Sequence, residues 1–312
     1  MSTGAGDLWA TPLAALFPGQ NSQILGMGRE LYEKSGAAKQ VLDQAEAALP
    51  GLLEIMWDGP EERLKLTANQ QPALVAAGVA AFAAWQEAGG EMPTFAAGHS
   101  LGEFTALVAA GSLALGDAVQ IVRKRGEYMQ EAVPQGKGAM AAILKLDAQF
   151  IEQVCSETEG VVEIANLNAP GQTVISGEAK AVGAAGERLA RQRARVVPLK
   201  VSAPFHCSLM KPAADKLAQD LANITMSLPT FGVVSNVTAD LHDDDRAIAG
   251  LLVRQVTSPV RWVESLRRLH SLGARRFVEF GSGKVLTGLV SRTLEDVSAQ
   301  AVVDMASLEE AL

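Results

Sequence analysis

The sequence predicts an α/β fold, made of a large subdomain with a parallel sheet and a small subdomain inserted into it. Apolar stretches of strand length alternate with helical patterns over residues 11–134 and again over 203–312, which is typical of a parallel sheet with helices on both faces. Residues 135–202 follow a different order of strands and helices. Finally, Gly98-His99-Ser100-Leu101-Gly102 marks a sharp turn between a strand and a helix.

The first part of the large subdomain follows from hydrophobic periodicity and from turn residues. A buried strand over 13–17 ends at Pro18-Gly19, and the pattern over 28–49 indicates one helix that Pro50-Gly51 stops. The other elements expected here are a long apolar helix over 69–88, a strand over 94–98, and helices over 102–110 and 115–132.

Residues 135–202 are expected to form a ferredoxin-like unit. Strands are predicted over 138–144, 161–166, 173–176 and 195–201, and helices over 148–157 and 178–192. This βαββαβ order is that of the split βαβ unit. The large subdomain then resumes, with helices over 209–221, 244–255 and 262–272 and strands over 231–236 and 276–280.

Composition narrows the class of protein. The 312 residues include 48% hydrophobic residues and carry a net charge of -8, which argues against nucleic acid as the main partner. The two cysteines lie far apart in sequence, so we expect no disulfide framework and a cytoplasmic location. The longest apolar run, 72–85, is shorter than the roughly 18 residues typical of a membrane span. No signal peptide is recognised, and residues 1–10 are interpreted as a loose leader.

The segment 98–102 matches the G-x-S-x-G nucleophile elbow. Glycines on both sides of the turn let a strand pass sharply into a helix, which lifts the Ser100 hydroxyl clear of the backbone. The N–H of Leu101, at the positive start of the helix, would then face a developing oxyanion. The alternative is a turn of small residues with an incidental serine.

A nucleophilic serine needs a base, and the chain has four histidines. His99 adjoins the serine and is expected to point away from it, His242 is expected to be solvated in a hydrophilic loop, and His270 is expected on a charged helix surface. His206 lies where the inserted unit returns to the large subdomain, and a junction loop can reach into a cleft. Elimination therefore favours His206, the alternative being a packed histidine beside Pro204.

Seen together, the motifs of this chain resemble those of malonyl-CoA:acyl carrier protein transacylases and of the related acyltransferase domains of polyketide and fatty acid synthases. The resemblance runs from about residue 17 to residue 289. It is carried, in order, by Phe17-Pro-Gly-Gln-Asn-Ser-Gln23, Gly98-His-Ser-Leu-Gly-Glu103, Arg125-Gly126, Asn166-Leu-Asn168-Ala-Pro-Gly-Gln172, Pro204-Phe-His206, Val253-Arg-Gln255 with Ser258-Pro259-Val-Arg-Trp262, and Gly283-Lys-Val-Leu286.

The resemblance implies a large subdomain like that of the α/β-hydrolases and a set of catalytic roles. Ser100 would be the nucleophile and His206 the base, oriented by the backbone carbonyl of Gln255. The amides of Leu101 and Gln20 would form the oxyanion hole.

The same resemblance implies the substrates. Arg125 would bind the free carboxylate of malonate, as a guanidinium can with two parallel hydrogen bonds, and Phe205 and Asn168 would line the substrate site. Without the resemblance, Arg125 would be interpreted as a solvated helix cation beside Arg123 and Lys124. The implied partners are malonyl-CoA and acyl carrier protein, with no bound cofactor, no metal, no nucleic acid and no membrane.

Three other functions stay open at this point. The transfer could supply a polyketide pathway instead of fatty acid biosynthesis. A serine hydrolase or thioesterase shares G-x-S-x-G, and Asp245 and His270 follow the serine in the order of acid and base that such an enzyme needs. A non-catalytic binding module is the third.

An acidic carrier protein would need a basic surface on this acidic chain. The sequence offers two stripes. The first consists of Arg188, Arg191, Arg193, Arg195 and Lys200, and the second of Arg267, Arg268, Arg275, Arg276 and Lys284.

Overall fold

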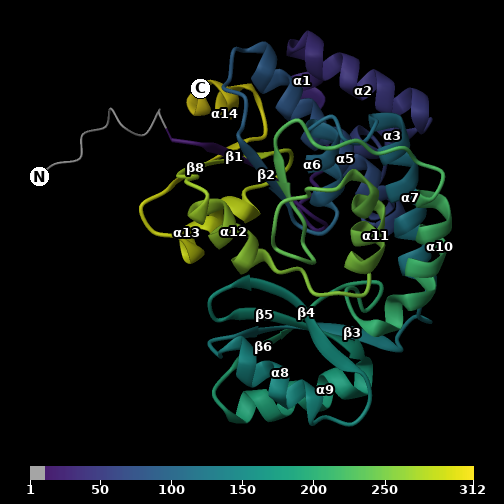
Figure 1. The fold of residues 1–312 in the computed structure, drawn as a ribbon. Helices are drawn as coiled ribbons and strands as arrows, with labels where there is room; N and C mark the ends of the chain where they lie inside the picture. The colour runs from purple at the N-terminus through teal and green to yellow at the C-terminus, as the bar shows by residue number, and fades with distance from the viewer. Residues whose placement is uncertain (1–10) are drawn as a thin grey trace, which may run out of the picture.

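The computed structural model describes residues 11–312, and the predicted leader 1–10 lies outside them. A five-stranded parallel sheet forms the centre of the larger part (Figure 1). Its strand order is β7-β2-β1-β8-β9, with β1 at Leu13–Phe17, β2 at Phe95–Gly98, β7 at Gly232–Val234, β8 at Arg276–Phe280 and β9 at Ser298–Val302.

Helices cover both faces of this sheet because its central strand is apolar on both faces. Leu13, Ala15 and Phe17 of β1 belong to one buried cluster, and Ala14 and Leu16 belong to another. The first cluster contains residues of α2 (Gly36–Ala48), α5 (Thr67–Glu87), α6 (Gly102–Ala109), α7 (Leu115–Glu131), α10 (Lys211–Leu221) and α11 (Asp245–Gln255). The second contains residues of α12 (Trp262–Ser271) and α13 (Val285–Thr293). This arrangement is that of a doubly covered parallel sheet.

The smaller part is a four-stranded antiparallel sheet in the order β4-β5-β3-β6. It is built from β3 (Gly138–Leu144), α8 (Ala148–Ser156), β4 (Val162–Ala169), β5 (Gln172–Glu178), α9 (Ala179–Arg191) and β6 (Arg195–Pro198). Figure 1 shows α8 and α9 on the face that points away from the large sheet. The order of elements confirms the predicted βαββαβ unit, whereas the boundaries 11–134, 135–202 and 203–312 stay a prediction.

Two backbone hydrogen bonds join β4 of the small sheet to the larger part. Leu167 N–H donates to the Val260 carbonyl, and Val260 N–H donates to the Ala165 carbonyl, both at 2.9 Å. Strand β4 is thereby held beside the segment between α11 and α12. This contact brings residues of the small sheet close to the end of β2.

Most predicted elements exist within a few residues of their expected bounds, and the helix expected over 28–49 is the main exception. It is two helices, α1 (Arg29–Lys34) and α2, because Ser35 is extended at φ -117° and its side chain caps Ala38 N–H. Five elements were not predicted: α3 (Leu52–Trp57), α4 (Glu61–Leu64), α13, β9 and α14 (Met305–Ala311). A short 3-10 turn, Ser208–Met210, precedes α10. Over residues 11–312, no helix has the length and hydropathy needed to cross a membrane.

Candidate active site

The glycines on either side of Ser100 shape the turn that carries it. A Cβ atom on Gly98 would lie 1.8 Å from the carbonyl carbon of Gly102, and one on Gly102 would lie 2.0 Å from the Phe17 carbonyl oxygen. Only glycine leaves room for so close a backbone approach. The turn holds Ser100 in the left-handed region, at φ 52°, and such strain in a residue other than glycine is typical of a nucleophile elbow.

The hydroxyl of Ser100 faces an imidazole from 106 residues along the chain. Its Oγ lies 2.7 Å from His206 Nε2, and Nδ1 of the same ring lies 2.9 Å from the backbone carbonyl oxygen of Gln255. Because a carbonyl oxygen only accepts, Nδ1 carries the ring proton and Nε2 accepts from the hydroxyl. The structure therefore places a hydroxyl, an imidazole and an orienting carbonyl in one hydrogen-bonded line.

Burial keeps the His206 ring neutral. The residue is 4% exposed. Burial, and after it the positive charge of Arg125, lowers the pKa of His206 to about 3. At neutral pH the ring is therefore in the form that can accept a proton.

Arg125 lies beside the same hydroxyl, although Lys124 next to it is exposed. Arg125 itself is 1% exposed, so the alternative that it is a solvated helix cation is wrong. Its Nη2 donates to Ser100 Oγ at 3.1 Å and to the Gln255 side-chain oxygen at 3.0 Å, and its Nη1 donates to Gln71 Oε1 at 2.7 Å. Burial lowers the pKa of Arg125 to about 10, which leaves the guanidinium charged at neutral pH.

Two backbone N–H groups are free to donate to an anion. Leu101 is fully buried and directly precedes α6, and amides at a helix start carry partial positive charge. Gln20 is fixed by its side chain, whose Nε2 donates to Gln70 Oε1 at 3.1 Å. Within the described part of the chain, neither the Leu101 nor the Gln20 N–H donates a hydrogen bond to another residue.

Comparison with known proteins places this site in a family. The acyl transferase domain family matches residues 15–309. The chain belongs to the acyl transferase family. A malonyl CoA-acyl carrier protein transacylase of Bacillus subtilis is 48% identical over 306 residues, which cover 96% of each chain. One of Escherichia coli K12 is 45% identical, covering 97% of this chain and 99% of the relative.

Solved structures agree with this assignment. An acyl carrier protein S-malonyltransferase from Vibrio cholerae matches with a TM-score of 0.94 at 43% identity, and the match covers 97% of this chain and 100% of the other. A malonyl-transacylase solved in complex with its type II polyketide acyl-carrier protein matches with a TM-score of 0.94 at 45% identity, covering 97% and 99% of the two chains. The fold of this acyltransferase is therefore that of the predicted class.

The small sheet of this acyltransferase reaches the elbow through Asn168 on β4. Its side-chain Oδ1 lies 2.8 Å from His99 Nε2, and the His99 ring packs against Trp262 with ring centroids 5.4 Å apart. Burial lowers the pKa of His99. The His99 ring thus contacts Asn168 and Trp262 and points away from the Ser100 hydroxyl, as expected. Phe205, which precedes His206 in the chain, is buried at 8% exposure.

The other two histidines were expected at the surface, and for His242 that expectation is wrong. Its side chain has no exposed area and its Nε2 lies 3.0 Å from Glu103 Oε1. Clusters of acidic residues in the sequence around it concealed its burial. His270 lies half-buried on α12, and Asp245 is exposed at the start of α11. The hydroxyl of Ser100 bonds to His206 and Arg125, and neither member of the hydrolase pair Asp245 and His270 contacts it.

Several polar residues of the site were not predicted. Asn236 Oδ1 accepts the Ser100 N–H at 2.6 Å, and its Nδ2 donates to the Gly98 carbonyl at 2.7 Å. Glu103 and Gln71 are fully buried beside the elbow and Arg125. Only Glu103 had a signal in the sequence, its place directly after the G-x-S-x-G motif.

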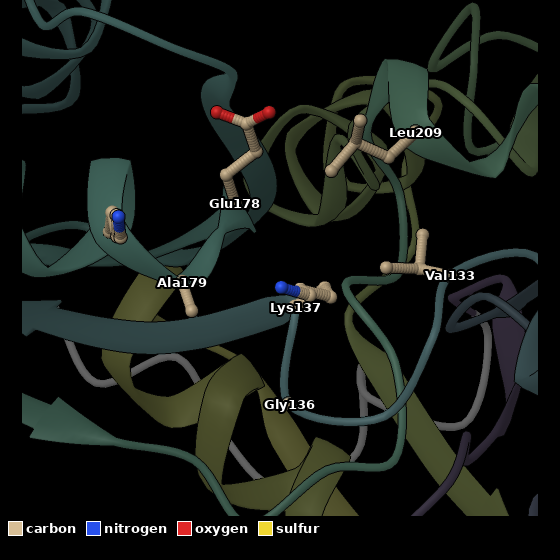
Figure 2. Close-up of a pocket in the computed structure, with 7 residues that line it drawn as sticks. Val133, Gly136, Lys137, Glu178, Ala179 and Leu209 are labelled. Carbon is tan, nitrogen blue, oxygen red and sulfur yellow. The ribbon is translucent and has the colours of Figure 1, made fainter.

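A separate cavity of about 390 Å³ lies where the chain enters and leaves the small sheet (Figure 2). Val133, Lys137, Glu178 and Leu209 line it, and it contains none of the residues that contact Ser100. Within residues 11–312, no cluster of three or more histidine, cysteine or acidic side chains could hold a metal ion.

Proposed function

We propose that this chain is a malonyl-CoA:acyl carrier protein S-malonyltransferase that works through a malonyl-Ser100 intermediate. One observation carries the proposal: the Ser100 hydroxyl lies between a neutral imidazole, at 2.7 Å, and a buried guanidinium, at 3.1 Å. The first can activate the oxygen, and the second can select an acyl group that ends in a carboxylate. Close relatives with nearly full coverage are named malonyl CoA-acyl carrier protein transacylases.

In the first half-reaction, Ser100 Oγ attacks the thioester carbonyl carbon of malonyl-CoA while His206 Nε2 takes the hydroxyl proton. His206 then carries a proton on both nitrogens, and the Gln255 carbonyl continues to accept from Nδ1 at 2.9 Å. As the tetrahedral intermediate collapses, the C–S bond breaks and the coenzyme A thiolate takes the proton from Nε2. The product is malonyl-Ser100, an ester.

The negative charge on the carbonyl oxygen would be stabilised by the amides of Leu101 and Gln20. Donors of this kind lower the barrier by about 3 kcal/mol each, because they are fixed before the charge develops. Both amides lack a partner within residues 11–312, and this supports their assignment as the oxyanion hole.

Arg125 would bind the malonyl carboxylate while the thioester lies at Ser100. Two hydrogen-bond donors beside Ser100 are unused. Arg125 Nε and Gln71 Nε2 are buried and have no hydrogen-bond partner within the described chain. Buried donors of this kind are costly unless something accepts from them. A carboxylate, which accepts several hydrogen bonds, fits this pair, whereas the methyl end of an acetyl group has no atom that can accept a hydrogen bond.

In the second half-reaction, the thiol of the carrier's phosphopantetheine arm attacks the malonyl-serine ester. His206 Nε2 takes the thiol proton and returns it to Ser100 Oγ as the C–O bond breaks. Coenzyme A must leave before the carrier arm enters, so the kinetics are ping-pong. Coenzyme A and phosphopantetheine act here as substrates, and no bound cofactor takes part in the proposed scheme.

The carrier protein would dock on one of the two basic stripes. In the first, Arg188 pairs with Glu157 at 2.6 Å, and the members that remain exposed without an ion pair among the described residues are Arg191, Arg193, Arg195 and Lys200. In the second, Arg268 pairs with Asp240 at 2.8 Å. Arg276 of this stripe is buried on β8 and pairs with Glu91 at 2.5 Å, so it is not part of the surface, whereas Arg267 and Lys284 are exposed. Charge reversal at each stripe, followed by the salt dependence of carrier turnover, identifies the docking surface, because docking contacts weaken with salt.

We place the transfer in the cytoplasm and in fatty acid biosynthesis, with supply of a polyketide pathway as the second candidate. The second candidate is kept because one similar structure is a malonyl-transacylase bound to a type II polyketide acyl-carrier protein. Turnover with carrier proteins of the two pathways, compared at equal concentration, separates them.

The central test is incubation with malonyl-CoA, or with acetyl-CoA in parallel, followed by digestion and mass spectrometry. We expect a malonyl adduct on Ser100 that disappears when holo-carrier is added and reappears as malonyl-carrier. An adduct on another residue contradicts the proposal. Release of free malonate in place of malonyl-carrier would instead favour the hydrolase alternative.

A further inference from the structure

A second buried polar cluster lies behind the elbow, and the proposed chemistry makes no use of it. Glu103, in the first turn of α6, and His242, after β7, both have side chains without exposed area. His242 Nε2 lies 3.0 Å from Glu103 Oε1. Since a carboxylate buried in a protein core is costly unless it is paired and hydrogen-bonded, this pair needs a physical reason.

The other carboxylate oxygen of Glu103 connects the pair to the active site. Glu103 Oε2 accepts from Gln255 Nε2 at 2.7 Å and from the Asn236 N–H at 3.0 Å. On the far side of the same amide, Gln255 Oε1 accepts from Arg125 Nη2 at 3.0 Å. A continuous line of hydrogen bonds therefore runs from His242 through Glu103 and Gln255 to Arg125.

Two acceptors set which way the Gln255 amide faces: its Nε2 donates to Glu103 Oε2 at 2.7 Å and to the Ser100 carbonyl oxygen at 3.0 Å. An ionised carboxylate only accepts hydrogen bonds, so the Gln255 nitrogen must point to Glu103 and the oxygen must point to Arg125. If the amide turned over, its NH₂ group would face the guanidinium and two sets of donors would meet without an acceptor. In the observed orientation, Gln255 Oε1 fixes one edge of Arg125 and leaves Nε without a partner among residues 11–312.

We propose that Glu103 and His242 are positioning residues for Arg125, and thereby for the preference for a carboxylate-bearing acyl group. Glu103 fixes the Gln255 amide, and His242 fixes Glu103. The inference rests on the proposed function, in which Arg125 binds the malonyl carboxylate. Neither residue touches the substrate in this scheme.

The contribution of His242 follows from its hydrogen bond to Glu103. Its Nδ1 is buried without a partner in the described part of the chain, and a proton there would be a buried unpaired donor. Because a carboxylate oxygen only accepts, His242 Nε2 is the donor in the bond to Glu103 Oε1. Glu103 also supplies negative charge near Arg125, which raises the pKa of the guanidinium against the effect of burial. Without the His242 donor, one carboxylate oxygen would be left buried and unsatisfied.

The test compares malonyl and acetyl loading of Ser100 in single-turnover experiments followed by intact-protein mass spectrometry. We expect His242→Ala and Glu103→Gln to lower kcat/KM for malonyl-CoA about tenfold or more, the usual consequence of leaving one buried polar group unpaired. Acetyl loading needs no guanidinium and should change less than about threefold. His242→Gln keeps an N–H that can reach Glu103, and should restore most of the malonyl preference. His270→Gln, at a half-buried position on α12 that does not contact Ser100, serves as the matched control.

Two further variants separate failure of the inference from failure of the proposed function. Arg125→Ala alone should abolish the malonyl preference, and adding Glu103→Gln to it should change the ratio of malonyl to acetyl loading no further. If Arg125→Ala abolishes the preference but the Glu103 and His242 variants keep it, or lose both activities equally, the inference is wrong. If Arg125→Ala keeps the preference, the proposed role of Arg125 is wrong, and the inference falls with it.

Discussion

Replacing Arg125 with alanine is the most direct test of how this site selects its acyl group. The change removes the donors at 3.1 Å from Ser100 Oγ, at 3.0 Å from Gln255 Oε1 and at 2.7 Å from Gln71 Oε1. In the proposed scheme it also removes two hydrogen bonds to the malonyl carboxylate. Hydrogen bonds to charged groups contribute about 1.5–3 kcal/mol each, so loading by malonyl-CoA should fall by about 10²–10⁴-fold.

Acetyl loading should not fall with malonyl loading. An acetyl group carries no carboxylate, so it loses no contact when Arg125 is removed. The positive charge of Arg125 also helps to lower the pKa of His206. Without it, the imidazole becomes a stronger base, and loading by acetyl-CoA should stay the same or rise.

The assay is the rate of acyl-Ser100 formation with each thioester, measured by quenched-flow mass spectrometry. Lys124→Ala is the matched control, because Lys124 is the exposed neighbour and pairs with Asp220 at 2.7 Å. Circular dichroism and thermal unfolding check that the Arg125 variant is folded, since Glu103 loses a buried counter-charge. Equal losses for malonyl-CoA and acetyl-CoA in a folded variant would refute the reasoning.

Four other predictions concern pH and packing. The pKa of about 3 for His206 predicts that kcat/KM for loading stays flat between pH 6 and 8, whereas a titration near 6.5 there would contradict it. Below pH 6.5, the ordinary pKa of histidine, the unfolded chain binds more protons at position 206 than the folded protein does. The contribution of His206 to stability is therefore present above pH 6.5 and is lost as pH falls toward 3. Urea unfolding at several pH values measures how the free energy of unfolding changes with pH. Burial raises the pKa of Glu279 to about 7, so ionisation of this carboxyl destabilises the fold as pH rises from 4.5 to 7. Glu279→Gln should therefore narrow the difference in Tm between pH 5 and pH 8. An unchanged difference in Tm would show that Glu279 does not cause it. Gly102→Ala should lower the free energy of unfolding by about 3 kcal/mol or more, because the added Cβ would lie 2.0 Å from the Phe17 carbonyl oxygen. The control is Gly183→Ala on α9, where an added Cβ would meet nothing within 4 Å, and it should stabilise the protein by about 0.5–1 kcal/mol. Similar free energies of unfolding for the two variants would contradict this account.

The sequence by itself determined the features that depend on neighbours in the chain. Strands and helices follow from the local period of apolar residues, and the elbow follows from two glycines beside Ser100, so both were predicted from segments of a few residues. Local signals also explain the main error in the fold. The apolar period continues across Ser35, and only the extended backbone at that residue divides the helix expected over 28–49.

Only the tertiary structure decided which polar groups are buried together. It brought His206, which the sequence favoured only by elimination, to the Ser100 hydroxyl 106 residues away, and it buried Arg125 while Lys124 on the same helix stayed exposed. It also placed His242, from an acidic stretch of sequence, against Glu103 in the core. The physical reason is that burial and hydrogen-bond partners depend on how distant segments pack, and hydrophobic periodicity carries no information about the identity of a polar partner.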